Sequence, residues 1–201
     1  MIRTLACVSS LLLIASFPAR SARVGSPAPD FSATDSNGKP QNLAQYRGKF
    51  VVLEWHNREC PYTNKHYESK NMQNLQKQWT NRGVVWFTVI SSAPGTQGYM
   101  TADAENAFVA KVNAVPTAVL LDPSGQLGHL YGAKTTPDMF IINPDGKLIY
   151  EGAIDDRPTT DISDVAPAKN YVNVALGEAM AGKPVSDPVT RPYGCSVKYA
   201  H

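Results

Sequence analysis

The segment Phe50-Val-Val-Leu-Glu-Trp-His-Asn-Arg-Glu-Cys60-Pro-Tyr-Thr-Asn-Lys-His-Tyr67 combines a short apolar run, a turn and the start of a helical pattern. Residues 50–55 are mostly apolar and partly β-branched, which predicts a buried strand. Residues 63–79 are rich in helix formers and contain neither glycine nor proline, so we expect one helix there. Cys60 therefore falls on the turn between strand and helix, where Pro61 suits the first helical position.

A cysteine at the start of a helix is expected to be reactive. The unpaired backbone N–H groups and the positive end of the helix dipole both favour the thiolate over the thiol. Lys65 and His66, further along the same segment, are candidates to add positive charge. The alternative is that Cys60 is a small buried apolar residue, as free cysteines often are. The order of strand, turn, Cys-Pro and helix favours the reactive thiol.

These residues resemble the active-site motif of the thioredoxin fold. Cys60-Pro-Tyr-Thr63 has Thr63 where the second cysteine of Cys-x-x-Cys would stand, and Glu54 matches the buried acid of the preceding strand. Further matches are spread along the chain after about Val24, namely Pro27-Ala-Pro-Asp-Phe31, Gly48-Lys49, Thr135-Thr-Pro137-Asp138, Asn143-Pro-Asp-Gly146, Asp155-Asp156 and Gly194-Cys-Ser-Val-Lys-Tyr199. The chain is thereby similar to peroxiredoxin-like thioredoxin-fold proteins of the alkyl hydroperoxide reductase / thiol-specific antioxidant superfamily.

This resemblance implies an α/β protein with a thioredoxin-like fold, in which helices flank a central mixed sheet. An N-terminal β-hairpin is expected around Asp35-Ser-Asn-Gly-Lys39, because Asn-Gly favours a tight turn. Residues 84–90 are apolar almost throughout, which suits a parallel strand covered on both faces. We expect the thioredoxin-like domain to span residues 24–183, followed by a flexible tail, residues 184–201, that carries Cys195.

Residues 1–21 have the pattern of a secretory signal peptide. Arg3 precedes an apolar run over residues 5–17, and small residues follow, with Ser21 as a candidate cleavage position. The apolar run is shorter than the roughly 20 residues that a membrane span needs. We therefore expect a periplasmic or secreted protein with no stable membrane insertion after cleavage; the alternative is an N-terminal membrane anchor.

Export would change the charge and the cysteine count. Removing Arg3 and Arg20 would take the formal net charge from +2 to 0, leaving no basic patch to suggest nucleic acid or a membrane surface as partner. Removing Cys7 would leave Cys60 and Cys195 in an oxidising compartment, where they could pair. Three roles stay open for Cys195: a resolving thiol, half of a static structural disulfide, or an unpaired thiol.

The resemblance also implies the surroundings of Cys60. Thr136-Pro137 corresponds to the cis-proline that faces the active-site cysteine, and the Thr136 backbone would hydrogen-bond an extended peptide or orient a small oxidant. With them, Pro61, Tyr62 and Thr63 form the expected substrate-binding residues. Glu54, if buried below the cysteine, would have a raised pKa and could shuttle its proton. The alternative for Glu54 is a salt bridge to a lysine or arginine.

The expected chemistry is attack by the Cys60 thiolate on a disulfide sulfur or a peroxide oxygen. Cys195 or an external thiol reductant would then resolve the mixed disulfide or sulfenic acid, with no cofactor and no metal. Thr63 in place of a second cysteine argues against the function of a general disulfide reductase. Leu53 and Asn57 replace the proline and threonine of the peroxiredoxin motif, which argues against efficient peroxidase activity.

Other readings remain at this stage. No arginine stands close to Pro137 in the sequence to orient peroxide, and Arg58 is only a candidate substitute. A copper chaperone or non-catalytic binding module of the same fold is a further alternative, with Cys60 and either His56 or His66 as soft ligands.

Overall fold

The computed structural model describes residues 22–200. The predicted signal peptide over residues 1–21, and with it Cys7, lies outside the described residues. Among the residues that are described, no helix is both long enough and apolar enough to cross a membrane.

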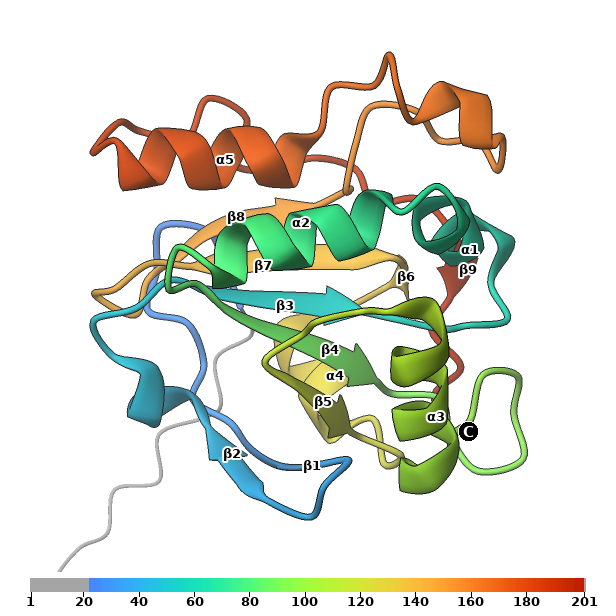
Figure 1. Cartoon of the computed structure of the whole chain (residues 1–201). Coiled ribbons are helices and arrows are strands. Elements are labelled where there is room, and N and C mark those ends of the chain that lie inside the picture. The colour runs from blue at the N-terminus through green and yellow to red at the C-terminus, as the bar shows by residue number, and fades with distance from the viewer. Residues whose placement is uncertain (1–21, 201) are drawn as a thin grey trace, which may run out of the picture.

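A seven-stranded mixed sheet forms the centre of the molecule, in the order β2-β1-β5-β4-β3-β7-β8 (Figure 1). Strands β3, β4 and β5 run parallel to one another, and the other neighbours pair antiparallel. The hairpin of β1 and β2 confirms the turn predicted from Asn-Gly. The strands are β1 (Ser32–Asp35), β2 (Pro40–Asn42), β3 (Val51–Trp55), β4 (Val85–Ile90), β5 (Ala118–Leu121), β7 (Asp138–Ile142) and β8 (Leu148–Gly152).

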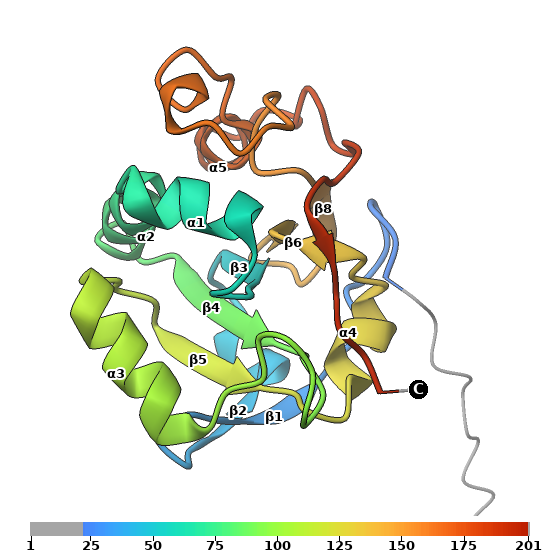
Figure 2. The same ribbon diagram turned by 90° about the vertical axis from the view of Figure 1, so that its right-hand side faces the viewer.

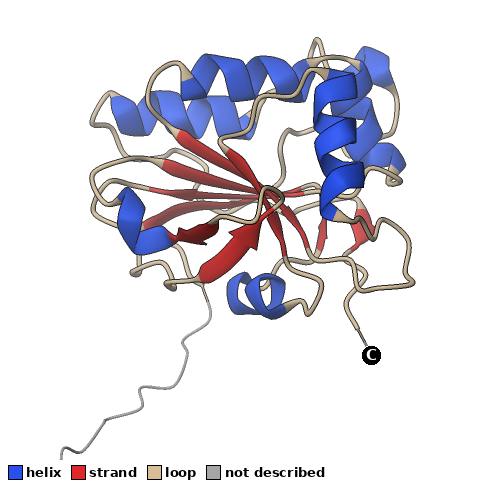
Figure 3. Cartoon of the chain, turned by 60° about the horizontal axis from the view of Figure 1, so that its bottom comes forward, coloured by secondary structure: helices blue, strands red, loops and turns tan. Residues whose placement is uncertain are grey.

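Helices cover both faces of this sheet, as the strands and helices of Figure 3 show. One face buries a cluster with side chains from α1, α2 and α5, against which apolar residues of α3 also pack. The opposite face packs against α4, η1 and the N-terminal segment that carries Ala28 and Phe31. The helices are α1 (Pro61–Glu68), α2 (Asn71–Thr80), α3 (Ala102–Val112), α4 (Gln126–Tyr131) and α5 (Tyr171–Met180), with short 3₁₀ turns at η1 (Leu43–Tyr46) and η2 (Ile162–Asp164). The helix-flanked mixed sheet expected from the sequence is confirmed.

The single helix predicted over residues 63–79 is wrong, because the chain breaks it into α1 and α2. Lys70 adopts a left-handed backbone conformation, with φ at 63°, and α2 begins at the next residue. The break lets α1 present its first turn at the end of β3 while α2 lays Met72, Leu75 and Trp79 on the sheet. Since position 70 is not a glycine, the sequence carries no signal for this change of direction.

The tail beyond α5 returns along the domain and is not a loose extension. Its short strand β9 (Cys195–Ser196) pairs antiparallel with β6 (Thr135–Thr136), and together they form a separate two-stranded sheet. Figure 2 shows this segment, in red, passing β6 and continuing beside α4. The pairing brings the end of the chain to the residues that precede β7.

Candidate active site

Cys60 lies at the end of the segment that connects β3 to α1, at the position that the sequence predicts. It is the N-cap residue of α1, and Pro61 opens the helix. The Cys60 side chain is completely buried, with 0% of the residue exposed. The sulfur therefore lies beyond the carboxyl end of a central strand, and the surrounding chain covers it.

Cys195 of the tail is the nearest chemically reactive neighbour. Antiparallel pairing sets Cys195 opposite Thr136, and its thiol lies close enough to Cys60 to shift the pKa of that cysteine. In its thiol form Cys60 donates to the carbonyl oxygen of Thr136, with a sulfur to oxygen distance of 3.0 Å. Both cysteines are free thiols here, and Cys195 is partly exposed. Two cysteines distant in sequence thus form a contacting pair.

The pKa values of the two thiols move in opposite directions. Burial acts to raise the pKa of Cys60, but the side chains of Cys195 and Thr136 and the backbone N–H of Thr63 stabilise the thiolate, outweigh burial and lower the pKa. Burial and the neighbouring Cys60 raise the pKa of Cys195 to about 11. Polar groups of the tail, of β6 and of the first turn of α1, rather than a neighbouring cation, therefore favour a thiolate on Cys60.

The other expected substrate-binding residues gather around this pair. The Thr136-Pro137 peptide bond is cis, as the resemblance implies. Thr136 and Thr63 are buried, whereas Tyr62 is partly exposed and its ring packs edge-on against that of Tyr193, with centroids 5.9 Å apart. The turn, the proline loop and the tail thus meet at one place.

Glu54 is fully buried on β3, with 0% exposed, and its carboxylate accepts four side-chain hydrogen bonds. The donors are Tyr67 Oη at 2.7 Å, Trp86 Nε1 at 2.7 Å, Gln76 Nε2 at 3.1 Å and Thr88 Oγ1 at 3.3 Å. Burial outweighs these donors and raises the pKa of Glu54 to about 7. We call these five residues the Glu54 cluster.

The salt bridge considered for Glu54 is not formed with any lysine or arginine of residues 22–200. Its one possible ionic neighbour is His56, whose Nδ1 lies 3.9 Å from Glu54 Oε1. Burial, with the charge of Arg58, lowers the pKa of His56 to about 3, so this imidazole is neutral. Glu105 of α3 is a second buried acid that sequence reasoning missed, and burial raises its pKa to about 7.

Lys65 and His66 do not serve as charges for Cys60. Both are buried and face Asp155, with Lys65 Nζ at 4.0 Å and His66 Nε2 at 3.9 Å from its Oδ2. The hydroxyl of Tyr193 donates to Asp155 and lies 3.3 Å from Lys65 Nζ. We call Lys65, His66, Asp155 and Tyr193 the tail anchor, because they join α1 and the loop after β8 to the tail. Only the folded chain reveals this role, because Lys65 and His66 are distant in the sequence from Asp155 and Tyr193.

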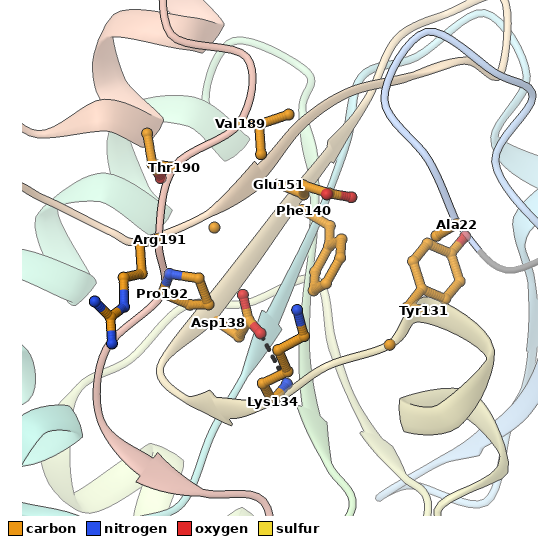
Figure 4. A pocket seen from close by; sticks show the side chains of 12 residues that line it. Ala22, Tyr131, Lys134, Asp138, Phe140, Glu151, Val189, Thr190, Arg191 and Pro192 are labelled. Carbon is orange, nitrogen blue, oxygen red and sulfur yellow. Dashed lines mark hydrogen bonds between the residues drawn. The ribbon is translucent and has the colours of Figure 1, made fainter.

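A cavity of about 560 Å³ lies beside the tail, between residues 189–192, the start of β7 and the end of β8 (Figure 4). In it the Asp138 carboxylate accepts a hydrogen bond from the backbone N–H of Lys134 at 2.9 Å. Neither Cys60 nor Cys195 lines this cavity. It therefore gives the tail open space on one side without belonging to the thiol pair.

The histidines do not join the cysteine. His56 lies against Glu54 and His66 against the tail anchor. Within the part of the chain that the structure describes, no three His, Cys, Asp or Glu side chains form a group able to hold a metal ion.

Comparisons with known proteins agree with this geometry. The model of the AhpC/TSA family matches residues 24–151. Thiol-disulfide oxidoreductase ResA of Bacillus subtilis is 32% identical over 127 residues, which cover 62% of this chain and 64% of the relative. The alignment thus spans just under two thirds of that relative. The ResA of Bacillus thuringiensis subsp. konkukian is 29% identical over 133 residues, covering 64% of this chain and 68% of the relative.

Solved structures support the thioredoxin-like fold. A putative thiol:disulfide interchange protein DsbE from Chlorobium tepidum superposes with a TM-score of 0.51 at 29% identity, covering 65% of this chain and 85% of its own. A hypothetical protein from Sinorhizobium meliloti reaches a TM-score of 0.75 at 22% identity, covering 90% of this chain and 97% of its own. The second match extends over most of the chain and concerns the fold alone.

Proposed function

Because the chain belongs to the AhpC/TSA family, we propose that it is a thiol-disulfide oxidoreductase in which Cys60 and Cys195 form the redox-active pair. The observation that carries this proposal is the meeting of both cysteines at Thr136, whose carbonyl oxygen lies 3.0 Å from Cys60 Sγ and whose backbone pairs with Cys195. Thr63 removes the usual partner within the motif, and Cys195 supplies a second sulfur from the tail instead. The similarity to oxidoreductases named ResA supports the same class of chemistry.

The reaction proceeds by two exchanges. The Cys60 thiolate attacks one sulfur of a substrate disulfide, forming a mixed disulfide, and the substrate's other sulfur leaves with the electron pair. The Cys195 thiol then loses its proton and attacks Cys60 Sγ, which forms the Cys60 to Cys195 disulfide and releases the second substrate thiolate. Two electrons pass to the substrate, and an external thiol reductant restores the dithiol.

Glu54 acts as a proton store below this pair. It is buried and its pKa lies near neutrality, so it can hold or release a proton at physiological pH. Its hydrogen bonds go to the Glu54 cluster and not to Cys60, which makes it a positioning and proton-balancing residue. Substrates contact Pro61, Tyr62 and Thr63 on one side, and Thr136 and Pro137 on the other.

Peroxide reduction is the second candidate, favoured by the complete burial of Cys60, which suits a small oxidant. The thiolate would attack a peroxide oxygen, giving a sulfenic acid and an alcohol or water. Condensation with Cys195 would then give the same disulfide and release water. The charge of Arg58 contributes to the pKa shifts of His56 and Glu105, which lie away from the thiol pair.

The proposed setting is outside the cytoplasm, in the periplasm or medium, where proteins with disulfides are the substrates. The signal-peptide pattern of residues 1–21 supports this setting. N-terminal sequencing of the exported protein tests it, with a chain beginning near Ala22 as the expected result.

The activity test compares wild type with Cys60→Ser and Cys195→Ser. We expect Cys60→Ser to abolish reduction of insulin by dithiothreitol, and Cys195→Ser to accumulate a mixed disulfide on Cys60. Hydrogen peroxide consumption, measured in parallel, separates the second candidate. Equal insulin reduction by wild type and Cys60→Ser would refute the proposed function.

A further inference from the structure

The segment Tyr193–Tyr199 is fastened at its first residue. The Tyr193 hydroxyl donates to Asp155 and lies 3.3 Å from the Lys65 ammonium, which is buried beneath it. The Tyr193 ring also packs against that of Tyr62. Removal of this hydroxyl would leave buried charged groups short of a partner, so the contact resists separation.

The same segment is fastened at its last residue. The Tyr199 hydroxyl donates to the carbonyl oxygen of Ala133 at 2.8 Å, and its ring stacks on His129 with centroids 4.0 Å apart. Just before it, the carbonyl oxygen of Lys198 accepts a hydrogen bond from the Ala93 N–H at 2.8 Å. The tail is therefore a strap with two fixed ends.

Between these ends the strap occupies the edge of β6. Thr136 pairs with Cys195, and Thr135 with Ser196. Gly194 has φ at 140°, and a Cβ atom there would lie 2.1 Å from the carbonyl oxygen of Thr136. Only glycine permits this approach, so the strap fits the edge closely. An extended peptide adding a strand at Thr136 would need the same backbone groups.

We propose that the segment Tyr193–Tyr199 is the resident occupant of the β6 edge, and that an extended, disulfide-bearing substrate must displace it before Cys60 can react. This inference rests on the proposed function. The strap covers a cysteine with 0% exposure, and it already fills the backbone edge that such a substrate would use. The segment before the strap runs between two cavities, each of about 560 Å³, which leaves room for it to swing away.

The strap thereby sets substrate specificity. A small disulfide needs only the sulfur of Cys60, whereas a protein segment also needs the edge at Thr136. The sequence of the strap indicates which peptide fits the β6 edge. It is an antiparallel strand in which a glycine precedes a cysteine that lies opposite Thr136. The preferred partner is therefore an extended Gly-Cys segment whose cysteine is in a disulfide.

The test uses the full chain carrying Cys195→Ser, so that Cys60 reacts without a resolving thiol. In this background Gly194→Ala detaches the strap, and Gly177→Ala on α5 is the matched control, since a Cβ there meets nothing within 4 Å. Two reagents are compared. One is 5,5′-dithiobis(2-nitrobenzoate); the other is a peptide copying Arg191–Tyr199 whose cysteine is joined to thionitrobenzoate. Release of thionitrobenzoate gives each rate, and peptide mass spectrometry locates the product on Cys60.

We expect Gly194→Ala to raise the rate with the peptide by about tenfold. This corresponds to weakening the binding of the strap to β6 by about the contribution of one hydrogen bond. The small reagent should gain much less, and Gly177→Ala should change neither rate. Replacing the glycine of the peptide by alanine should abolish the peptide's gain. Equal acceleration of both reagents, or none, would overturn the inference while leaving the proposed function intact. If Cys60 reacts with neither reagent in any variant, both the proposed function and this inference fail.

Discussion

The Glu54 cluster and the tail anchor each bury a carboxylate near Cys60, yet they are built differently. Glu54 accepts four hydrogen bonds from donors on β4, α1 and α2, all within the domain. Asp155 meets Lys65 at 4.0 Å and the hydroxyl of Tyr193, which comes from the tail. One carboxylate therefore holds layers of the core together, whereas the other holds a separate segment against it.

This difference shows that burial alone does not define the role of a residue at a redox site. Removing the centre of the Glu54 cluster should weaken the whole fold, because its donors lie between the sheet and its covering helices. Weakening the tail anchor should mainly expose Cys60, because the tail that carries Tyr193 can detach while the domain stays folded. The two regions thus separate global stability from local access.

The largest effect is expected from Glu54→Ala. Four buried donors lose their acceptor, so the free energy of unfolding should fall by roughly 3–5 kcal/mol. Urea unfolding followed by tryptophan fluorescence measures this loss. Glu68→Ala, at an exposed position of α1, is the control and should change stability by less than about 0.5 kcal/mol. Similar losses in the two variants would contradict the central role of Glu54.

A smaller effect is expected from pH. Since burial raises the pKa of Glu54 in the folded state to about 7 from an ordinary value of 4.5, the folded chain holds this proton more tightly than the unfolded chain. The contribution of Glu54 to the free energy of unfolding is therefore fully present below pH 4.5. It is lost as the pH rises to about 7, which lowers the free energy of unfolding by roughly 3 kcal/mol.

Glu54→Gln should remove that part of the slope. Urea unfolding at a series of pH values between 4 and 8 compares the two proteins. Glu105, whose pKa is raised to about 7 by burial and also by the charge of Glu54, remains in both proteins, so the difference between them includes its response to the loss of that charge. Parallel stability curves would show that Glu54 does not titrate in this range.

The smallest change in stability is expected in the tail anchor. Tyr193→Phe removes the hydroxyl that joins Asp155 and Lys65, so opening of the tail should become easier by about 1 kcal/mol. The rate of Cys60 alkylation by iodoacetamide should rise several-fold, with little change in global unfolding. Tyr99→Phe, at a residue 38% exposed, is the control. An unchanged alkylation rate would mean that the anchor does not control access.

Local pattern was sufficient to predict the centre of the site. The apolar run before Cys60 and the proline after it indicate a strand, a turn and a helix start, and Glu54 lies on that strand. The position of Thr136-Pro137 came from the family resemblance. The break at Lys70 could not be predicted, because it depends on how two helices pack on a finished sheet and not on a local breaker.

The contacts between distant segments were also out of reach. Lys65 and Asp155 look like surface charges in the sequence, and only the folded chain shows that both are buried under Tyr193. Likewise, the sequence could not place Cys195 beside Thr136, which follows from the pairing of β9 with β6. Such contacts depend on the path of the tail, which no periodic pattern encodes.

The antiparallel pairing of Cys195 with Thr136 imposes a length constraint on the tail. Side chains alternate between the two faces of a strand, so inserting or deleting one residue between Tyr193 and Cys195 would turn the sulfur away from Cys60. Insertions in residues 181–187, before the fastened part, carry no such penalty. Related chains could therefore vary freely in overall tail length while keeping the count of residues from the tyrosine to the cysteine unchanged.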